Sequence, residues 1–303
     1  MASGFSNIDI KVLGDSIVTD SKRMNIPVNA FAMKVDSREN LSKGDTVKVP
    51  ILTKPADAIA YNASSNNYTT DNGETEDVKN VVLSQHYKKS FVVSGDDMAR
   101  LGEVYVQEKL RSYMDAMDSA VMADILSLVT NANFGAAGIV GIASAFDATD
   151  MNHLRALLRT KVGPNTPLTA FLDTTYFEYL LEDASLKNAL NYGSPSAAQD
   201  GVLSGVRGIS KTYSSDLIPA NSENLKGFAM AQGALLFGMA TITKPADISM
   251  VVDYQLVTNP VNGMVYGVYK QIDPATHGLI IGVEGLWGKA VGNGSFLSRI
   301  TSA

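Results

Sequence analysis

The chain has 303 residues, near the size at which a single hydrophobic core stops growing, so we expect one large irregular domain or two closely joined ones. Charged residues make up only 18% of the sequence, below the roughly 25% usual in soluble domains, which suggests that other protein covers much of the surface. The net charge of −6 argues against a general binder of nucleic acid or anionic membranes, and the absence of cysteine excludes disulfides, thiolate metal sites and cysteine nucleophiles.

The first 45 residues contain short apolar runs broken by polar and turn-forming residues. Ile8–Leu13 and Phe31–Val35 are typical of short strands, whereas Gly14 and Pro27 interrupt any longer pattern. An extended segment of this kind buries little apolar surface against itself. We therefore predict an arm that lies on a neighbouring molecule.

Residues 46–93 predict one long β-hairpin. The first leg begins at Thr46 and alternates polar and apolar side chains, and the second leg runs from Val78 to Val93. The segment between the legs, residues 62–77, is polar, acidic towards its end and without a core of its own. A loop of this length is uncommon inside a compact domain, so we expect a hairpin that projects from the body of the molecule.

An amphipathic pattern from Ser94 to about Thr130 predicts one very long helix, and Ser94 with Asp97 forms a capping-box sequence at its start. At 1.5 Å per residue the helix would be on the order of 50 Å long, so it would serve as a spine for the rest of the fold. Its apolar positions recur mostly every three or four residues: Met98, Leu101, Tyr105, Met114, Met117, Val121, Ile125 and Leu128. Its solvent side is expected to carry Glu108, Arg111 and Asp115 at pairing distance.

The rest of the chain mixes short helices and strands after a flexible glycine- and alanine-rich link from Ala132 to Phe146, and becomes β-rich towards the end. The first predicted elements are a helix capped by Thr149 or Asp150 and ended by Gly163, a buried strand at Leu168–Leu172, a helix from Thr174 or Thr175, and a strand at Val206–Tyr213. The later predicted strands are Ala234–Phe237, Ile248–Tyr254, Val265–Tyr269, Gly278–Val283 and a final segment Trp287–Ile300. The dipeptide Asn262-Gly263 predicts a tight hairpin turn.

One enzyme motif is present in the arm. Gly14-Asp15-Ser16-Ile17 resembles the Gly-Asp-Ser-Leu block of a family of esterases, in which Ser16 would be the nucleophile. Those enzymes place a histidine three residues after an aspartate near the C-terminus, whereas here His277 follows Asp273 by four, and their Gly-x-Asn-Asp block is missing. The three histidines have no partners at ligand spacing, so we expect no catalytic residues, no cofactor and no metal site.

Three sequence segments stand out within this order of elements: Gln85–Asp97 at the entry to the long helix, Leu168–Leu181 in the mixed region, and Leu279–Val291 near the end. Together with the order of arm, hairpin, long helix, mixed lobe and β-rich return, they resemble the major capsid proteins of tailed bacteriophages, which have the Hong Kong 97-type fold. The resemblance implies an α+β fold made of an N-terminal arm (1–45), an extended β-hairpin loop (46–93), a peripheral domain with the spine helix (94–148), an axial domain (149–235) and a β-rich return to the peripheral domain and C-terminus (236–303).

The same resemblance implies a structural protein, not an enzyme, that self-assembles into an icosahedral head enclosing packaged double-stranded DNA. The implied partners are copies of itself in hexamers and pentamers, scaffolding and portal proteins, and DNA contacted non-specifically. Whether a decoration protein also binds is left open. We expect no membrane partner, because no stretch approaches 18 uninterrupted apolar residues. The implied location is the virion capsid, assembled in the host bacterial cytoplasm. Two alternatives remain: an encapsulin-type nanocompartment shell, which shares the fold, and the Gly-Asp-Ser-type esterase.

The distribution of charge gives candidate residues for the subunit interface. The arm and the extended loop are the two elements that leave their own subunit in the family that the sequence resembles. We therefore predict that arm cations, or other basic positions, meet the acidic hairpin tip across a subunit boundary, each pair contributing about 0–1 kcal/mol. The candidates are Lys22 and Arg23 in the arm, and Asp71, Glu74, Glu76 and Asp77 at the tip.

Overall fold

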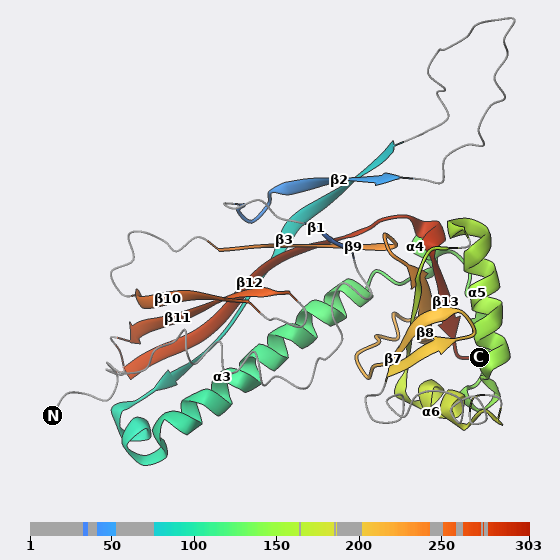
Figure 1. Cartoon of the computed structure of the whole chain (residues 1–303). Helices are drawn as coiled ribbons and strands as arrows, with labels where there is room; N and C mark the ends of the chain where they lie inside the picture. The colour runs from blue at the N-terminus through green and yellow to red at the C-terminus, as the bar shows by residue number, and fades with distance from the viewer. Residues whose placement is uncertain are drawn as a thin grey trace, which may run out of the picture.

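The computed structural model describes residues 33–35, 41–52, 76–163, 165–184, 186, 202–242, 251–258, 263–273, 275 and 278–303. Within these ranges the strands form two sheets, and the long helix α3 (Gly95–Leu126) runs along one face of the first sheet. In Figure 1 the second sheet, with helices α5 (Ala148–Val162) and α6 (Thr174–Glu182), stands beyond the C-terminal end of α3.

The first sheet contains seven of the described strands and is organised around the 14-residue strand β12. β12 pairs with β3 along one side, and with β11 and then β9 along the other. The strands are β1 (Met33–Val35), β2 (Thr46–Leu52), β3 (Glu76–Val93), β9 (Leu235–Ala240), β10 (Val251–Thr258), β11 (Val265–Asp273) and β12 (Gly278–Val291). Every pair is antiparallel except β1 with β9.

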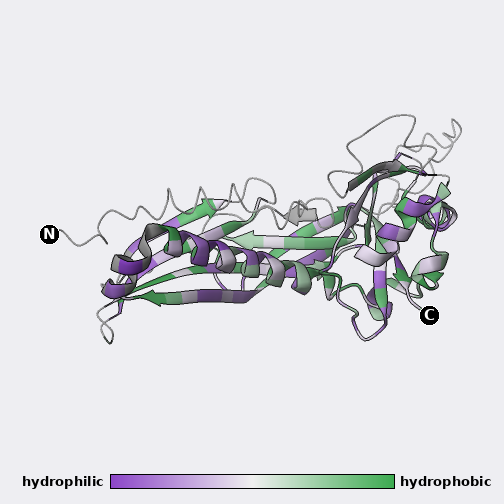
Figure 2. Cartoon of the chain, turned by 90° about the horizontal axis from the view of Figure 1, so that it is seen from below, coloured by the Kyte–Doolittle hydropathy of each residue, from purple (hydrophilic) through white to green (hydrophobic). Residues whose placement is uncertain are grey.

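α3 packs its apolar stripe against this sheet. Met114, Met117 and Val121 are at most 3% exposed, which confirms the inward face predicted from the sequence. The sheet contributes Phe237, Tyr266, Val268, Val283 and Trp287 to the same core. With 32 residues the helix is about 48 Å long, as expected of a spine, although it ends at Leu126, four residues before the predicted end. Figure 2 shows α3 crossing the face of the sheet, with hydrophilic and hydrophobic residues alternating along it.

Two carboxylates of α3 add polar contacts to this apolar packing. Asp118 is only 1% exposed and accepts a hydrogen bond from the Tyr266 hydroxyl. Asp124 accepts a hydrogen bond from Trp287 Nε1 at 3.0 Å and forms an ion pair with Lys289 of β12. Burying a polar group without a hydrogen-bond partner costs free energy, and these bonds supply the partners. They also fix where the helix lies along the sheet.

The second sheet draws strands from distant parts of the chain. Its order is β4 (Ile139–Val140), β13 (Leu297–Thr301), β8 (Leu225–Ala231), β5 (Leu168–Leu172), β7 (Ile209–Ser214) and β6 (Val202–Val206). The segment 236–303, which was expected to return to the peripheral domain, therefore supplies strands to both sheets. Two short helical turns, α4 (Asn131–Phe134) and η3 (Gly294–Phe296), lie where the chain passes from the first part to the second, and a third, η1 (Ala143–Ala145), lies between β4 and α5.

Both faces of the central strands β5 and β8 of the second sheet are largely buried. α5 and α6 cover one face, where they pack on Leu168, Ala170 and Ile300. On the other face the ring of Phe171 stacks between those of Tyr213 and Phe228, each at 5.2 Å, and these rings belong to the core that α3 shares with the first sheet. The two sheets are thus joined through one continuous core.

Several predicted boundaries need correction. Asp147, and not Thr149 or Asp150, caps α5, because its carboxylate accepts the N–H groups of both later residues at 2.7 and 3.1 Å while Asp150 bonds back to the Asp147 N–H. Similarly, Asp173 caps α6. Gly163 ends α5 as predicted, with φ at 89°.

The predicted single strand at Val206–Tyr213 is wrong, since this segment is a hairpin of β6 and β7. Its turn places Arg207 at φ 49° and Gly208 at φ 83°, the left-handed pair that a tight hairpin requires, but arginine is an unusual residue there. β8 was not predicted, because burial on both faces removes the alternation by which a strand is recognised.

Candidate subunit interface

β2 and the first part of β3 form an antiparallel ribbon at the upper edge of the first sheet in Figure 1. On its inner face Val49, Ile51 and Val81 are buried and pack with Leu236 of β9. Its outer face is open: Pro50 lies opposite Val78, and Val78 and Val82 are 48% and 40% exposed. A two-stranded ribbon is marginally stable alone, so the inner face anchors it. The outer face is mixed: Val78 and Val82 flank Asn80, which stands opposite Lys48, and these exposed side chains are available to another molecule.

The remainder of β3 presents an open backbone edge. From Ser84 to Val92 the strand pairs with β12 on one side, and no described strand pairs with its other side. Unpaired N–H and C=O groups on such an edge can accept a further strand, and Lys88 and Lys89 in this stretch limit uncontrolled pairing. Every side chain from His86 to Ser90 is exposed, and so are Ser84 and Val92.

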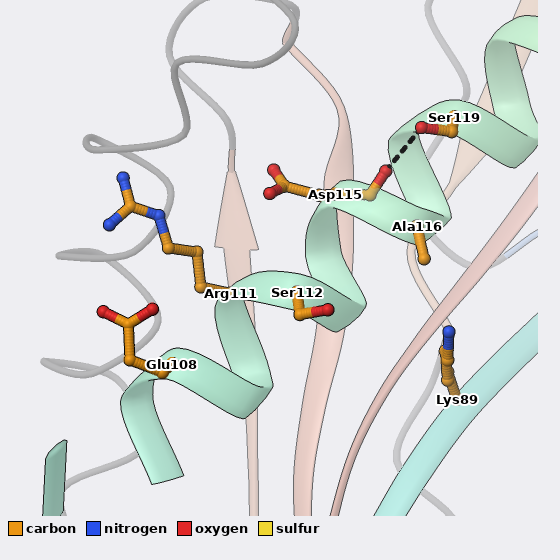
Figure 3. A pocket seen from close by; sticks show the side chains of 7 residues that line it. All are labelled: Lys89, Glu108, Arg111, Ser112, Asp115, Ala116 and Ser119. Carbon is orange, nitrogen blue, oxygen red and sulfur yellow. Dashed lines mark hydrogen bonds between the residues drawn. The ribbon is translucent and has the colours of Figure 1, made fainter. Parts of the chain in front are cut away.

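A polar groove separates β3 from the outward side of α3 (Figure 3). Lys89 lies on the β3 wall, with its ammonium 4.8 Å from the centre of the Tyr113 ring, within the range of a cation–π contact. The helix lines the rest of the groove with Glu108, Arg111, Ser112, Asp115, Ala116 and Ser119. With two cations and two carboxylates, the groove suits a polar chain of mixed charge better than a simple anion.

The predicted interface residues are placed only in part. Lys22, Arg23, Asp71 and Glu74 lie outside the described residues, so their predicted contacts stay predictions. Glu76 and Asp77 are not part of a loop tip, because they begin β3 and stand opposite Leu52 and Ile51 of β2. Asp77 also forms an ion pair with Lys79 of the same strand at 2.7 Å, on an exposed surface where such a pair contributes little.

Reasoning from the sequence missed an apolar patch on the second sheet. Val140 and Ile142 are 64% and 58% exposed, in the segment that had been interpreted as a flexible glycine-rich link. Ile139 and Val140 instead form β4, parallel to β13, and the Tyr176 hydroxyl donates a hydrogen bond to Gly141 O at 2.6 Å. Adjacent β-branched residues were the only sequence signal for this strand.

Membrane-spanning helices and clusters of metal ligands were both sought among the described residues. In that part of the chain no helix combines the length and the apolar character needed to cross a membrane. Nor do three histidine, aspartate or glutamate side chains come together there as a metal site would require. Ser16 and His277, the residues of the esterase alternative, lie outside the described residues.

The overall arrangement of these elements is similar to that of solved capsid chains. The capsid chain of cyanophage P-SCSP1u aligns over 88% of this chain and 85% of its own, with 13% identity and a TM-score of 0.55. The capsid chain of cyanophage Pam1 aligns over 85% of this chain and 84% of its own, with 15% identity and a TM-score of 0.55. The virus-like particle from Pyrococcus furiosus aligns over 97% of this chain and 100% of its own, with 12% identity and a TM-score of 0.51.

The chain therefore has the fold of phage capsid proteins, and the predicted α+β capsid fold is confirmed. No family profile matches the sequence, and no curated protein matches it. The likeness thus lies in the three-dimensional arrangement of the elements.

Proposed function

We propose that copies of this chain assemble side by side into a closed capsid shell, in which the chain is a structural subunit and not an enzyme. The observation that carries the proposal is the extent of the fold match, which covers 84–100% of the three solved shell chains named above. The same alignments cover 85–97% of this chain, and the solved chains are those of two phage capsids and a virus-like particle.

The surfaces of the subunit support the same proposal. The outer face of the ribbon, the open edge of β3 and the groove beside α3 all lie along one long element of the first sheet. Only 18% of the residues are charged, so contacts between copies can cover surface that a lone globule would have to keep polar.

The finer proposal is a tailed-phage head of the Hong Kong 97 type, with hexamers and pentamers around packaged double-stranded DNA. Scaffolding and portal proteins would be its partners, and assembly would take place in the host cytoplasm. A net charge of −6 per chain repels a polyanion at long range, so DNA would be retained by enclosure and by local non-specific contacts.

Negative-stain electron microscopy and light scattering of the purified full chain test the proposal. We expect closed shells, or rings that become shells as protein concentration rises. A chain that stays monomeric over a wide range of protein and salt concentrations would contradict it. Circular dichroism of the same samples shows that a failure to assemble does not result from unfolding.

A shell without a viral genome is the second candidate, an encapsulin-type compartment. The match to the Pyrococcus furiosus virus-like particle favours it, because the alignment covers all of that chain. Particles isolated from the native source distinguish the two candidates. Nuclease-protected double-stranded DNA supports a phage head, whereas an enclosed protein without DNA supports the compartment.

The esterase alternative has a direct test. We expect no hydrolysis of a short-chain ester beyond that of the Ser16→Ala variant. Hydrolysis that the wild-type chain shows and Ser16→Ala loses would contradict the non-enzymatic proposal.

A further inference from the structure

The turn Asn221–Asn224, which leads into β8, has an unusual backbone. Three of its four residues have positive φ angles: Asn221 at 49°, Ser222 at 58° and Asn224 at 52°. Residues other than glycine adopt this conformation at a free-energy cost, and they keep it where the surrounding structure imposes it. The contacts of the turn show what imposes it here.

Asn221 bonds to the end of the spine helix. Its side-chain Nδ2 donates to Leu126 O at 3.1 Å and to Val129 O at 2.8 Å. Leu126 O also accepts the Val129 N–H at 3.0 Å, so Asn221 adds a second donor at the last residue of α3 and supplies a donor to Val129 O in the turn that follows the helix. The turn thereby caps α3 from a position 95 residues away in the sequence.

Glu223 connects the turn to α4 and to β13. Its carboxylate oxygens accept the Asn131 N–H at 3.0 and 2.9 Å, at the start of α4. The same carboxylate pairs with Arg299 of β13, whose guanidinium also donates to Gly135 O at 3.1 and 2.8 Å. Arg299 is 3% exposed, and a buried ion is stable only when its hydrogen bonds are made, so the turn cannot shift without breaking this set.

The first sheet holds the same helix end from the other side. Lys289 of β12 donates to Asp124 O at 2.8 Å and to Ser127 Oγ at 2.7 Å. The C-terminal end of α3 is therefore bonded to the first sheet through Lys289 and, through Asn221, to the turn that begins β8 of the second sheet.

We propose that the turn Asn221–Asn224 is a rigid joint that sets the angle between α3 and the second sheet, with Asn221 as its positioning residue. Subunits that close a shell must meet their neighbours within a narrow range of angles, and a loose joint inside each subunit widens that range. The requirement for shell closure rests on the proposed function, whereas the rigidity of the joint does not.

Pulsed electron spin resonance tests the joint directly. Because the chain has no cysteine, Ser112→Cys on α3 and Asn152→Cys on α5 place two spin labels at exposed positions. Dilution with unlabelled chain removes distances between copies. We expect a narrow distance distribution for the otherwise native chain and a broader, shifted one for Asn221→Asp, which replaces the donor by an oxygen facing two carbonyls.

Asn224→Asp is the matched control. It makes the same chemical change at nearly the same φ, in a residue that is exposed and takes part through its backbone, where its C=O accepts the Ser302 N–H. Its distance distribution should equal that of the native chain. If Asn221→Asp fails to fold, Asn221→Gly replaces it, because glycine adopts the left-handed conformation and loses only the side-chain bonds.

Equal distributions for the native chain, Asn221→Asp and Asn224→Asp would overturn the joint, even if Asn221→Asp melts at a lower temperature. A broader distribution together with a loss of closed shells for Asn221→Asp would support the complete proposal. A broader distribution with normal shells would overturn the requirement for closure. A native chain that forms no shells refutes the proposed function, and the distance measurement still decides on the joint.

Discussion

Asp118 is a charged residue on the inward face of α3, where the sequence pattern leads one to expect an apolar side chain. It is stable there because the hydroxyl of Tyr266, itself 1% exposed, donates a hydrogen bond to it. Burying a carboxylate without its donors costs several times the value of an ordinary hydrogen bond. The pair therefore fixes the helix on the sheet at one position along its length.

Removing the Tyr266 hydroxyl should lower the stability of the fold. We expect Tyr266→Phe to lower the free energy of unfolding by about 1–3 kcal/mol, because a buried carboxylate loses a donor. Urea denaturation measures the change. Tyr269→Phe is the control, since Tyr269 lies on the same strand and is partly exposed, so it should change little. Equal effects for both variants would show that the Asp118 contact is not important for stability.

The buried tyrosines also predict how stability depends on pH. Burial, and then Asp118, raise the pKa of Tyr266 well above its ordinary value of 10.0. Below that value the hydroxyl is neutral in both the folded and the unfolded chain, so its contribution is complete. Above it the unfolded chain releases the proton first, so stability should fall as pH rises through 10. Unfolding curves at successive pH values measure this, and Tyr266→Phe should reduce the slope.

Val121 tests the apolar stripe of the spine. Its side chain is fully buried against the first sheet. We expect Val121→Asp to lose roughly 2 kcal/mol or more, because the change buries an unpaired charge and forfeits packing. Thermal melting detects the loss. Ser112→Asp, on the exposed side of the same helix, is the control, and wild-type stability for Val121→Asp would refute the assigned face.

At the scale of elements, the ribbon separates the contacts that fold the subunit from those available between subunits. Val81 faces the inner cluster, whereas its neighbour Val82 points to the open face, because side chains alternate along a strand. Valine at position 81 thus stabilises the subunit, whereas valine at position 82 is available for a contact between subunits. A substitution that keeps the shape of valine can test them separately.

We expect the double variant Val78→Thr and Val82→Thr to assemble poorly while its subunit melts at the native temperature. Threonine keeps the β-branched shape, and on the outer face its hydroxyl costs only the apolar contact with a neighbour. Val81→Thr is the matched control: it should lower subunit stability by about 1–3 kcal/mol, because it buries a hydroxyl. Native assembly of the double variant would exclude the outer face of the ribbon as a subunit contact.

At the scale of the whole molecule, electrostatics should influence assembly more than folding. If the predicted contacts between basic positions and the acidic segment are surface pairs, each contributes about 0–1 kcal/mol and is screened over about 8–10 Å near physiological ionic strength. Repeated at every boundary, they add up for a shell. They leave the single subunit almost unaffected.

Assembly should therefore weaken as salt concentration rises, which light scattering can follow. Changing Asp71, Glu74, Glu76 and Asp77 to lysine should block assembly without changing the melting temperature of the subunit. If the reversed variant assembles like the wild type at all salt concentrations, apolar burial alone holds the copies together. In this variant Lys79 also loses its ion pair with Asp77, and since the pair is exposed we expect this loss to change the stability of the subunit little.

The sequence by itself determined the elements whose signal is local. The 3.6-residue period of α3, its start after Ser94 and the buried positions Met117 and Val121 could all be predicted, because neighbouring turns of one helix carry the pattern. The same holds for the legs of the hairpin, whose alternation reflects a single buried face. The order of these elements was sufficient to suggest the capsid fold.

Only the tertiary structure decided how distant segments meet. The burial of Asp118, the division of the last strands between two sheets and the capping of α3 by Asn221 depend on partners about 70 to 150 residues away. The candidate interface shows the same limit, since Glu76 and Asp77 look like loop residues until their pairing with β2 is known. The physical reason is that a hydrogen bond or a buried face depends on proximity in space, and proximity between distant segments is set by the packing of the whole core.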